Sequence, residues 1–360
     1  MIADAGYDVF FVGGCVRNAL LSEPDSDVDI STIALPKQVM MLAKAAGLKA
    51  LPTGIDHGTV TVVSGVGTFE ITTFRRDVAT DGRRAVVAFS DNIADDARRR
   101  DFTMNALYAT PEGHIIDPLN GLPDLLARKV RFIEDADARI KEDYLRILRF
   151  FRFSAWYSGD DTGYDPDALS AIAANTDGLA TLSAERVHQE IAKLLSAPNP
   201  APAVGVMRQT GVLAVVLPGS DDQWLSIMVH LEEHLNIAPD WIGRLAILGG
   251  QDVADRLRLS KVEARKLDLL REVGFVGPAL PEVAYRYGQN IAEQVLMIRS
   301  AFAETLPDID QIKVIKTSST KVFPIKAADL MPAFTGPALG ARLAFLEDKW
   351  ISSDFTLDKG

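Results

Sequence analysis

The hydrophobic pattern of the chain changes abruptly near residue 133, and this change constrains the fold more than any other feature. Before it, short apolar runs bounded by glycine and polar turn residues predict strands, with two helical stretches between them. After it, apolar residues recur at helical spacing. The predicted strands cover residues 9–12, 27–31, 59–63 and 69–74, and the predicted helices cover residues 16–21, 36–46, 141–157, 168–175, 183–195 and 201–210.

We therefore predict an α+β fold, in which a small mixed sheet with helices is followed by an all-helical remainder. The length of 360 residues exceeds that of one ordinary domain and suggests about two to four packed units. We place the domain boundaries so that the domains cover residues 1–133, 134–197, 198–290 and 291–360.

Composition limits the class of protein. No apolar run in the sequence approaches the roughly 20 residues that a membrane-spanning helix needs, so we expect no membrane association. Cys15 is the only cysteine, which excludes an intrachain disulfide. The first residues lack the basic and then apolar profile of a signal peptide. We therefore expect a cytoplasmic protein.

The formal net charge of −11 opposes the binding of a nucleic acid at long range, because phosphate contacts depend on lysine and arginine. Basic residues nevertheless cluster locally. These clusters lie at residues 75–76, 83–84, 98–100, 146–152 and 256–271. We expect modest, salt-sensitive binding to a polyanion through such patches.

A Gly-Gly turn and a pair of aspartates indicate the chemistry of the first part of the chain. Gly13 and Gly14 follow the first predicted strand and open a helix that bears Arg17. Backbone amides at a helix start bind phosphate, and an arginine adds a charge-assisted bond. Asp27 and Asp29 alternate along the next predicted strand, so both point to one face. Paired carboxylates suit Mg²⁺, which indicates metal-dependent phosphoryl transfer.

Each motif taken alone has a structural explanation. An Asp-x-Asp pair is usually a solvated loop or strand edge, and a Gly-Gly turn before a helix is common in α/β proteins. The order and spacing of the two motifs favour a shared site instead. A dinucleotide-binding fold does not fit, because the sequence has neither Gly-x-Gly-x-x-Gly nor a Lys-Ser/Thr phosphate loop.

Six segments carry a resemblance to a known family. They cover residues 13–17, 27–29, 99–106, 116–121, 142–149 and 183–186, in this order. Together they resemble the class II tRNA nucleotidyltransferases, which comprise bacterial CCA-adding enzymes and poly(A) polymerases of the polymerase-β-like superfamily. The match spans roughly residues 8–195. Asn18 departs from the family pattern, in which aspartate is common at this position.

The resemblance implies template-independent addition of CCA to the 3′ end of tRNA from CTP and ATP, by Mg²⁺-dependent two-metal nucleotidyl transfer. It implies that Asp27 and Asp29 are catalytic and hold the Mg²⁺ ions, that Gly14 and Arg17 contact the triphosphate, and that Arg100 contacts the nucleotide. The four domains would be a nucleotidyltransferase head, a neck that recognises the base, a body and an RNA-binding tail. Both a monomer and a homodimer remain open.

The predicted helix of residues 141–157 carries Asp143, Arg146, Arg149 and Arg152 at every third position, in a stripe along one side. By composition alone, such a stripe is a surface laced with ion pairs. A carboxylate accepts hydrogen bonds and a guanidinium donates them, so Asp143 with Arg146 would accept cytosine and adenine and reject uracil and guanine. The resemblance implies that this pair reads the base and that Arg149 and Arg152 also contact the nucleotide.

Four other residues and one segment carry weaker expectations. Glu70 is expected on an edge strand facing water rather than as a third metal-binding acid. Asp101 is expected to cap the helix that follows it. His230 and His234 are expected to lie on a solvated helix face, since no third metal ligand is evident. Polar residues 77–84 are expected to form a mobile loop, which the resemblance links to the switch from C to A addition.

Several rival functions remain. A bacterial poly(A) polymerase shares the catalytic motifs, although residues 31–36 lack the basic, aromatic segment that is typical of those enzymes. An enzyme that adds only A would read the same base edge. The intact Asp27, Asp29 and Arg17 disfavour a catalytically silent RNA-binding relative. The basic stripe within residues 256–271 suits a long polyanion better than the substrate of a small-molecule nucleotidyltransferase.

Overall fold

The structure is a computed structural model that describes residues 1–24, 27–81, 84–159 and 162–357, of which residues 77–81 and 84–87 are described by their backbone alone. It divides into two compact units. Unit 1 comprises Met1–Leu194 with Ala203–Val216, and unit 2 comprises Leu195–Pro202 with Leu217–Gly360. Among the helices of the described ranges, none is both long and apolar enough to cross a membrane.

Unit 1 begins with a seven-stranded mixed sheet in the order β3-β4-β5-β2-β1-β8-β9. Its neighbouring strands are antiparallel, except for the parallel pair of β2 and β5. The strands are β1 (Val9–Val12), β2 (Asp29–Thr32), β3 (Lys49–Gly54), β4 (Thr59–Ser64), β5 (Gly67–Thr73), β8 (Tyr108–Ala109) and β9 (Ile115–Ile116).

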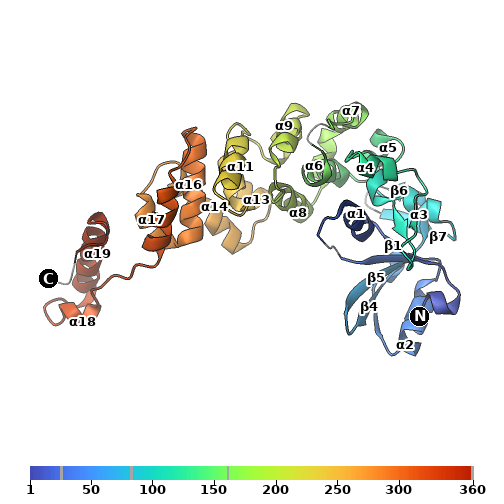
Figure 1. Cartoon of the computed structure of the whole chain (residues 1–360), viewed down its shortest axis with the longest axis horizontal. Helices are drawn as coiled ribbons and strands as arrows, with labels where there is room; N and C mark the ends of the chain where they lie inside the picture. The colour runs from blue at the N-terminus through green and yellow to red at the C-terminus, as the bar shows by residue number, and fades with distance from the viewer. Residues whose placement is uncertain (25–26, 82–83, 160–161, 358–360) are drawn as a thin grey trace. The chain divides into compact units, whose positions relative to one another are not determined.

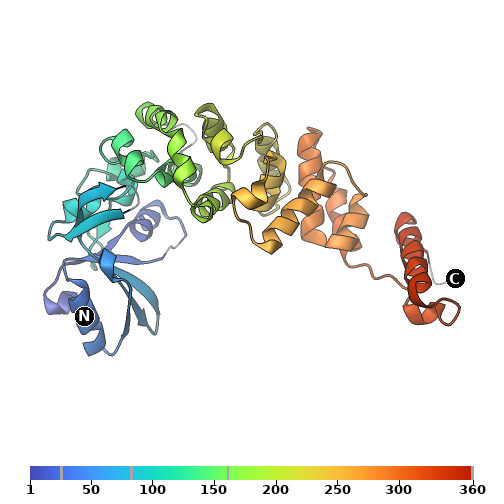
Figure 2. The ribbon, with the colours of Figure 1, turned by 180° about the vertical axis from the view of Figure 1, so that it is seen from behind.

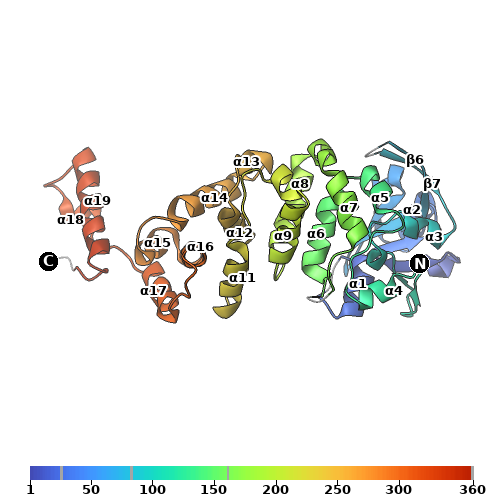
Figure 3. The same cartoon turned by 90° about the horizontal axis from the view of Figure 1, so that it is seen from above.

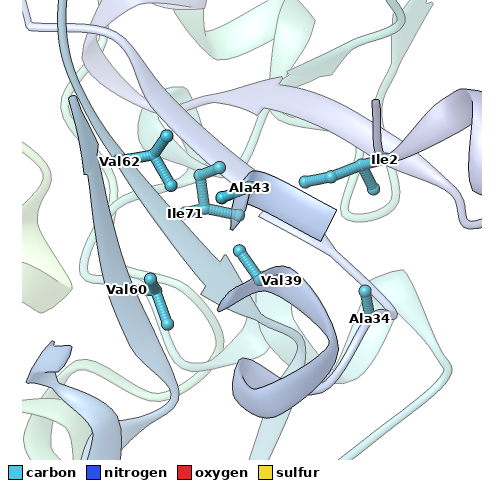
Figure 4. Packing of buried hydrophobic residues seen from close by; sticks show 7 residues of the cluster. All are labelled: Ile2, Ala34, Val39, Ala43, Val60, Val62 and Ile71. Atoms are coloured by element: carbon cyan, nitrogen blue, oxygen red, sulfur yellow. The ribbon is translucent and has the colours of Figure 1, made fainter. Parts of the chain in front are cut away.

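Helix α2 (Pro36–Ala45) covers one face of this sheet near β4 and β5 (Figure 1). Figure 4 shows Val39 and Ala43 of the helix directed toward Val60, Val62 and Ile71 of the two strands. All five side chains are at most 3% exposed. The strand residues alternate along their strands, so their neighbours project from the opposite face of the sheet.

That opposite face carries a second core and the charged residues of interest. Phe74 and Tyr108 pack edge to face, with their ring centroids 6.3 Å apart. The strand register places Asp29 of β2 beside Val12 of β1 and beside Glu70 of β5. Because paired residues on neighbouring strands share a face, the two acids lie side by side next to the buried Val12.

Residues 75–81 and 84–89 form a second, two-stranded antiparallel sheet (Figure 2). Its strands are β6 (Arg75–Asp81) and β7 (Arg84–Phe89). The sequence predicted a loop over residues 77–84, and for the described backbone this prediction is wrong; residues 82–83 lie outside the described ranges. The pairing was missed because ladder hydrogen bonds join main-chain groups and do not require apolar side chains.

Helices follow the sheet, and an aromatic cluster fixes them against it. Phe102 packs on Phe132 and on Phe153, at centroid distances of 5.0 and 5.2 Å. In Figure 3, α5 lies beside α6 and α7, with which it packs. The bounds are α1 (Gly14–Leu21), α3 (Ile93–Arg98), α4 (Leu122–Leu126), α5 (Ala136–Glu142), α6 (Leu145–Tyr157), α7 (Pro166–Ala174), α8 (Ala184–Leu195), α9 (Ala201–Gln209) and α10 (Val212–Val216).

The described part of unit 2 is helical. At its centre the Arg244 side chain, 1% exposed, forms an ion pair with Glu232, and it also donates to the main-chain oxygens of Leu195, Ala197 and Pro198. The helices are α11 (Leu225–His234), α12 (Trp241–Leu248), α13 (Val253–Arg256), α14 (Lys261–Gly274), α15 (Leu280–Tyr287), α16 (Gln289–Phe302), α17 (Ile309–Ser319), α18 (Ala327–Leu330) and α19 (Gly336–Ser352).

The α+β prediction is confirmed: a mixed sheet with helices precedes a long helical remainder. The division into four domains stays a prediction. Two details differ from expectation. Strand β2 begins at Asp29 rather than at Asp27, and the helix predicted over residues 141–157 is interrupted between Glu142 and Leu145.

Candidate active site

A cleft of about 580 Å³ in unit 1 is lined by all nine residues that the sequence predicted to act on metal or nucleotide. These are Gly14, Arg17, Asp27, Asp29, Arg100, Asp143, Arg146, Arg149 and Arg152. Eight basic and four acidic side chains line the cleft, so its charge is positive although the chain as a whole carries −11. A cleft of this charge attracts a polyphosphate.

The turn before α1 requires glycine at its first position. Gly13 has φ = 73° and ψ = −122°, a conformation that side-chain-bearing residues rarely adopt. A Cβ there would also lie 3.2 Å from Nη1 of Arg100. Gly13 therefore lets the chain turn sharply out of β1 and lets the Arg100 guanidinium lie against the turn. Gly14 then begins α1. Because Gly13 and Gly14 line the cleft, the first turn of this helix, with its unpaired main-chain amides, lies at the cleft.

Arg17 is held entirely by neutral groups among the described residues. It is 6% exposed and donates to Oδ1 of Asn105 at 2.5 Å, to Oδ1 of Asn18 at 2.8 and 3.1 Å, and to the Tyr157 hydroxyl at 2.8 Å. Its guanidinium also lies over the Tyr157 ring, 4.1 Å from the centroid. Burial lowers the pKa of Arg17, although an arginine stays charged at neutral pH. Its charge thus faces the cleft without an ion pair within the described ranges, although the nearby Asp101 carboxylate partly opposes the lowering of its pKa.

The two aspartates lie in different surroundings. Asp27 precedes β2 and is exposed, whereas Asp29 begins β2 and is half-buried. Burial, and then the negative charge of Glu70, raises the pKa of Asp29; Asp27 adds to the rise and Arg100 opposes it. Unlike the sequence prediction, Glu70 lies on β5, an inner strand between β4 and β2, although its side chain is exposed as expected.

The acids fit a divalent cation by their chemistry. Oxygen donors suit hard ions, and the burial and the neighbouring negative charge that raise the pKa of Asp29 are both offset by a bound cation. Within the described residues, no three His, Cys, Asp or Glu side chains are already gathered into a metal-binding group. His230 and His234 stack on the exposed face of α11, as expected of a solvated pair.

Arg100 lies between the turn and the core. Its Nη2 pairs with Asp96 at 3.3 Å and its Nε donates to the Tyr108 hydroxyl at 3.3 Å. Tyr108 in turn donates to Asp96 at 2.8 Å. Burial lowers the pKa of Arg100, but Tyr108 and Asp96 outweigh this effect and raise it. These contacts aim a permanent positive charge at the cleft.

Asp143 lies in a break between two helices rather than on the face of one. It ends α5 in an extended conformation, and its Oδ1 accepts a hydrogen bond from the amide of Leu145, which begins α6. Its Oδ2 accepts from Nη2 of Arg186, in α8, at 2.7 Å. Arg146 follows on the first turn of α6, where its Nη1 pairs with Glu142 at 2.6 Å.

Arg149 and Arg152 also have acidic partners. Arg149 pairs with Asp101 at 2.5 Å and Arg152 pairs with Glu190 of α8 at 2.5 Å. Asp101 was expected to cap a following helix, but Phe102 holds the N-cap position of the short 3₁₀ turn η3 (Thr103–Asn105). The Asp101 Oδ1 does accept the main-chain amide of Phe102 at 2.9 Å, and its Oδ2 forms the buried ion pair with Arg149. Burial alone would raise the pKa of Asp101, but Arg149 and the neighbouring hydrogen bonds lower it.

Sequence reasoning missed the groups that hold these arginines and Asp143 in place. They are Asp96, Asp101, Asn105, Glu142, Tyr157, Arg186 and Glu190. Glu142 stands close enough to Arg146 on the chain to be foreseen as an i,i+4 partner. Asp96 likewise stands four residues before its partner Arg100. The others are brought in by packing of separate segments, which a single sequence does not display.

A larger cavity of about 780 Å³ lies near the N-terminal ends of α5 and α7. None of the nine predicted residues lines it. Asp165 on its wall pairs weakly with Lys129 and Arg131 and caps α7. Its size therefore does not make it the better candidate, because it lacks the turn and the paired aspartates that suit phosphate and metal.

A glycine turn and two aspartates of a mixed sheet share one positive cleft with an arginine-bearing helix, and this arrangement defines a nucleotidyltransferase. The family model described as Poly A polymerase head domain matches residues 9–131. A second model, described as Probable RNA and SrmB- binding site of polymerase A, matches residues 164–223.

Individual relatives narrow the class further. The mitochondrial CCA tRNA nucleotidyltransferase 1 of Mus musculus is 30% identical, with 100% of this chain and 86% of that protein covered. The CCA-adding enzyme of Streptococcus pyogenes serotype M1 is 32% identical, with 99% and 92% covered. The crystal structure of Bacillus stearothermophilus CCA-adding enzyme in complex with CTP matches with a TM-score of 0.78 at 27% identity, over 98% of this chain and 91% of that one.

The chain therefore belongs to the family of CCA-adding tRNA nucleotidyltransferases, and the predicted class II resemblance is confirmed. Coverage differs between relatives. The CCA-adding enzyme of Leuconostoc citreum (strain KM20) is 39% identical over 65% of this chain, and the matched region spans 57% of that protein.

Proposed function

We propose that this protein adds CCA to the 3′ end of tRNA, using CTP and ATP and no template. One observation carries the proposal: a single cleft holds the phosphate-binding turn, the paired aspartates and the Asp143–Arg146 turn. The names of the similar proteins, CCA-adding enzyme and CCA tRNA nucleotidyltransferase, support the same substrates.

Asp27 and Asp29 would hold Mg²⁺, and Glu70 lies in register to support them. Two carboxylates with room for phosphate oxygens and waters suit Mg²⁺ better than a softer metal. The bound ions would supply a lowered pKa for the attacking hydroxyl and neutralisation of the triphosphate. The half-buried position of Asp29 would keep its carboxylate oriented toward the cleft.

The reaction joins the 3′ oxygen of the RNA to the α-phosphorus of the nucleotide and releases pyrophosphate. Arg17, with its neutral partners, would stabilise the charge that develops on the leaving pyrophosphate. The amide of Gly14 at the start of α1 would bind a phosphate oxygen. Arg100, held by Asp96 and Tyr108, would contact the nucleotide from the other side of the turn.

Base selection would rest on Asp143 and Arg146, with Arg149 and Arg152 contacting the rest of the nucleotide. The carboxylate accepts from the exocyclic amine of C or A, and the guanidinium donates to the adjacent ring nitrogen. Uracil and guanine present a carbonyl and an N–H in the same places, so both contacts would oppose them. The ion pair of Arg146 with Glu142 would hold the Arg146 guanidinium in place at the cleft.

We further propose the four-domain division, with residues 1–133 as catalytic head, 134–197 as base-reading neck, 198–290 as body and 291–360 as RNA-binding tail. A cytoplasmic location agrees with the single cysteine. A monomer and a homodimer both remain compatible with the proposal.

The test uses a tRNA transcript that lacks its 3′ CCA, with Mg²⁺ and CTP, ATP or both. Three added residues followed by arrest support the proposal. A long A tail on varied RNAs would identify a poly(A) polymerase, and A added only to primers ending in CC would identify an A-adding enzyme. No incorporation by the unmodified protein would leave the silent relative as the better description.

Asp27→Asn serves as the active-site variant and Asp56→Asn as its matched control. Asp56 is an exposed acid of the same sheet domain that does not line the cleft. We expect Asp27→Asn to lower kcat by about 10³-fold or more, the effect of losing several kcal/mol of transition-state stabilisation. Asp56→Asn should retain full activity, and Mg²⁺ should support more activity than Ca²⁺ at equal concentration.

A further inference from the structure

Arg186, in the first turn of α8, is tied to the residue proposed to read the base. Its Nη2 donates to Oδ2 of Asp143 at 2.7 Å, while the amide of Leu145 donates to Oδ1. Arg186 is 26% exposed and Asp143 is 31% exposed, so the pair is covered on one side and open on the other. Both oxygens of the carboxylate are thereby fixed before any base arrives.

The position of Arg186 is unfavourable for α8 itself. The first turn of a helix is the positive end of its dipole, so a cation there lowers the stability of the helix by about 0.3–1 kcal/mol. Arg186 is the third residue of α8, so its charge opposes the helix dipole there. Its acidic partner is Asp143, which belongs to a different part of the chain. The ion pair with Asp143 therefore explains the arginine at this position better than the stability of α8 does.

Both side chains also form the wall between two cavities. They line the active-site cleft, and they line a smaller cavity of about 320 Å³ behind it, together with Tyr144 and Ser183. An ionised carboxylate has about four lone-pair sites, and two are used by Arg186 and Leu145. The remaining sites are left for a ligand on the cleft side.

We propose that Arg186 is a positioning residue that sets base selectivity by holding the Asp143 carboxylate in one orientation. This inference rests on the proposed function. An acceptor fixed in place can pair with the amine of C or A only in the correct geometry, and it presents lone pairs to the carbonyl of U or G. A carboxylate released by loss of Arg186 can turn away from the wrong base and no longer excludes it.

The experiment measures kcat/KM for CTP and UTP on a tRNA transcript lacking CCA, and for ATP and GTP on a transcript ending in CC. We expect Arg186→Met to reduce the CTP/UTP and ATP/GTP ratios by about tenfold, the effect of about 1.4 kcal/mol of lost coupling. Arg186→Lys keeps a cation within reach of Asp143 and should recover part of each ratio.

A double-mutant cycle separates positioning from direct contact. If Arg186 acts through Asp143, then Arg186→Met should change the ratios little once Asp143→Asn is present. Arg98→Met is the matched control, because Arg98 pairs with Asp95 and Glu134 and does not line the cleft. It should leave every ratio unchanged.

Three results would overturn the inference. Equal losses of kcat/KM for CTP and UTP would show that Arg186 binds the phosphate, the sugar or the primer. Additive effects in the double variant would show that it does not act through Asp143. Inactive unmodified protein would remove the proposed function and this inference with it, whereas active protein with unchanged ratios removes the inference alone. Should Arg186→Met fail to fold, Arg186→Gln replaces it in the same cycle.

Discussion

At the scale of single residues, Gly13 combines two constraints that the sequence shows only in part. Its backbone conformation requires glycine, and Nη1 of Arg100 lies 3.2 Å from the position that a Cβ would take. The first constraint follows from the Gly-Gly motif. The second joins residues far apart in the chain, and it depends on how the segment after α3 folds back over the turn.

We expect Gly13→Ala to destabilise the protein by more than the roughly 1–2 kcal/mol that a left-handed conformation costs an alanine. The added methyl group would also push Arg100 aside and raise the KM for CTP. Gly113→Ala is the control, since Gly113 has φ = 88° with no atom within 4 Å of its Cβ position. Denaturant unfolding and steady-state kinetics measure both effects. Equal destabilisation by the two variants would contradict the role given to Arg100.

The negative charge of Asp29 lowers the stability of the folded protein. Its pKa is raised in the folded protein, so the folded state binds the proton more tightly than the unfolded chain does. Wild-type stability therefore falls as the pH rises through the folded-state pKa. We expect Asp29→Asn to be more stable than wild type at pH 7 without added metal, and to lose this advantage as the pH drops below the ordinary aspartate value of 3.8.

Thermal unfolding across pH measures this difference, and the same variant should be inactive. Adding Mg²⁺ should raise the Tm of the wild type more than that of Asp29→Asn, because binding to the folded state stabilises by mass action. A variant that is less stable than wild type at pH 7 would show that the charge of Asp29 is already compensated within the protein.

At the scale of elements, Tyr144 and Gly178 set the spacing between the turn at Asp143, proposed to read the base, and the segment that leads into α8. Gly178 lies in the 3₁₀ turn η4 (Thr176–Thr181), and a Cβ there would lie 2.1 Å from the Tyr144 ring. The ring follows Asp143 directly in sequence. This contact therefore fixes the distance across which Arg186 reaches its carboxylate partner.

We expect Gly178→Ala to cost about 1–3 kcal/mol by overpacking and to reduce the CTP/UTP ratio in the same direction as Arg186→Met. Gly340→Ala is the control: Gly340 lies within α19 with nothing near its Cβ position. Alanine there should stabilise by up to about 1 kcal/mol through helix propensity. Unfolding curves and the kinetic ratios test both variants, and full selectivity in a destabilised Gly178→Ala would break the proposed link.

The elements also show where sequence reasoning succeeds. The β1 turn and α1 were predicted because an apolar run, two glycines and helical spacing follow one another directly. Strand β3 was missed because Pro52 and Gly54 interrupt its pattern on the edge of the sheet. The break at Asp143 was missed because the apolar spacing continues through it, while the backbone there is extended. Local signals predict local structure, and packing decides the rest.

At the scale of the molecule, unit 2 has a buried ion pair of its own. The Arg244 and Glu232 side chains are 1% and 3% exposed. Burial raises the pKa of Glu232, and the paired Arg244 opposes this rise. A buried charge that loses its partner is strongly destabilising, whereas the removal of both partners can be neutral.

We expect Arg244→Met to destabilise the protein by about 3–5 kcal/mol and Arg244→Met with Glu232→Met to recover much of that loss. Calorimetry should show the shift in the unfolding of unit 2, while nucleotide binding, which we propose for the cleft of unit 1, should change little below the transition. The Arg286–Glu282 pair is half-exposed, so Arg286→Met provides a control with a small effect. A loss in Arg286→Met equal to that in Arg244→Met would contradict the importance of burial.

Four arginines of the cleft each carry an anion supplied by the protein. The pairs are Arg100 with Asp96, Arg146 with Glu142, Arg149 with Asp101 and Arg152 with Glu190. An incoming triphosphate thus competes for the arginines with carboxylates that are fixed to the protein, and not with mobile chloride ions. Few mobile ions are expelled on binding, so the slope of log affinity against log salt concentration should be shallower than the number of arginines suggests. The triphosphate then displaces the carboxylates because its negative charges lie close together, and not because the ionic strength is low.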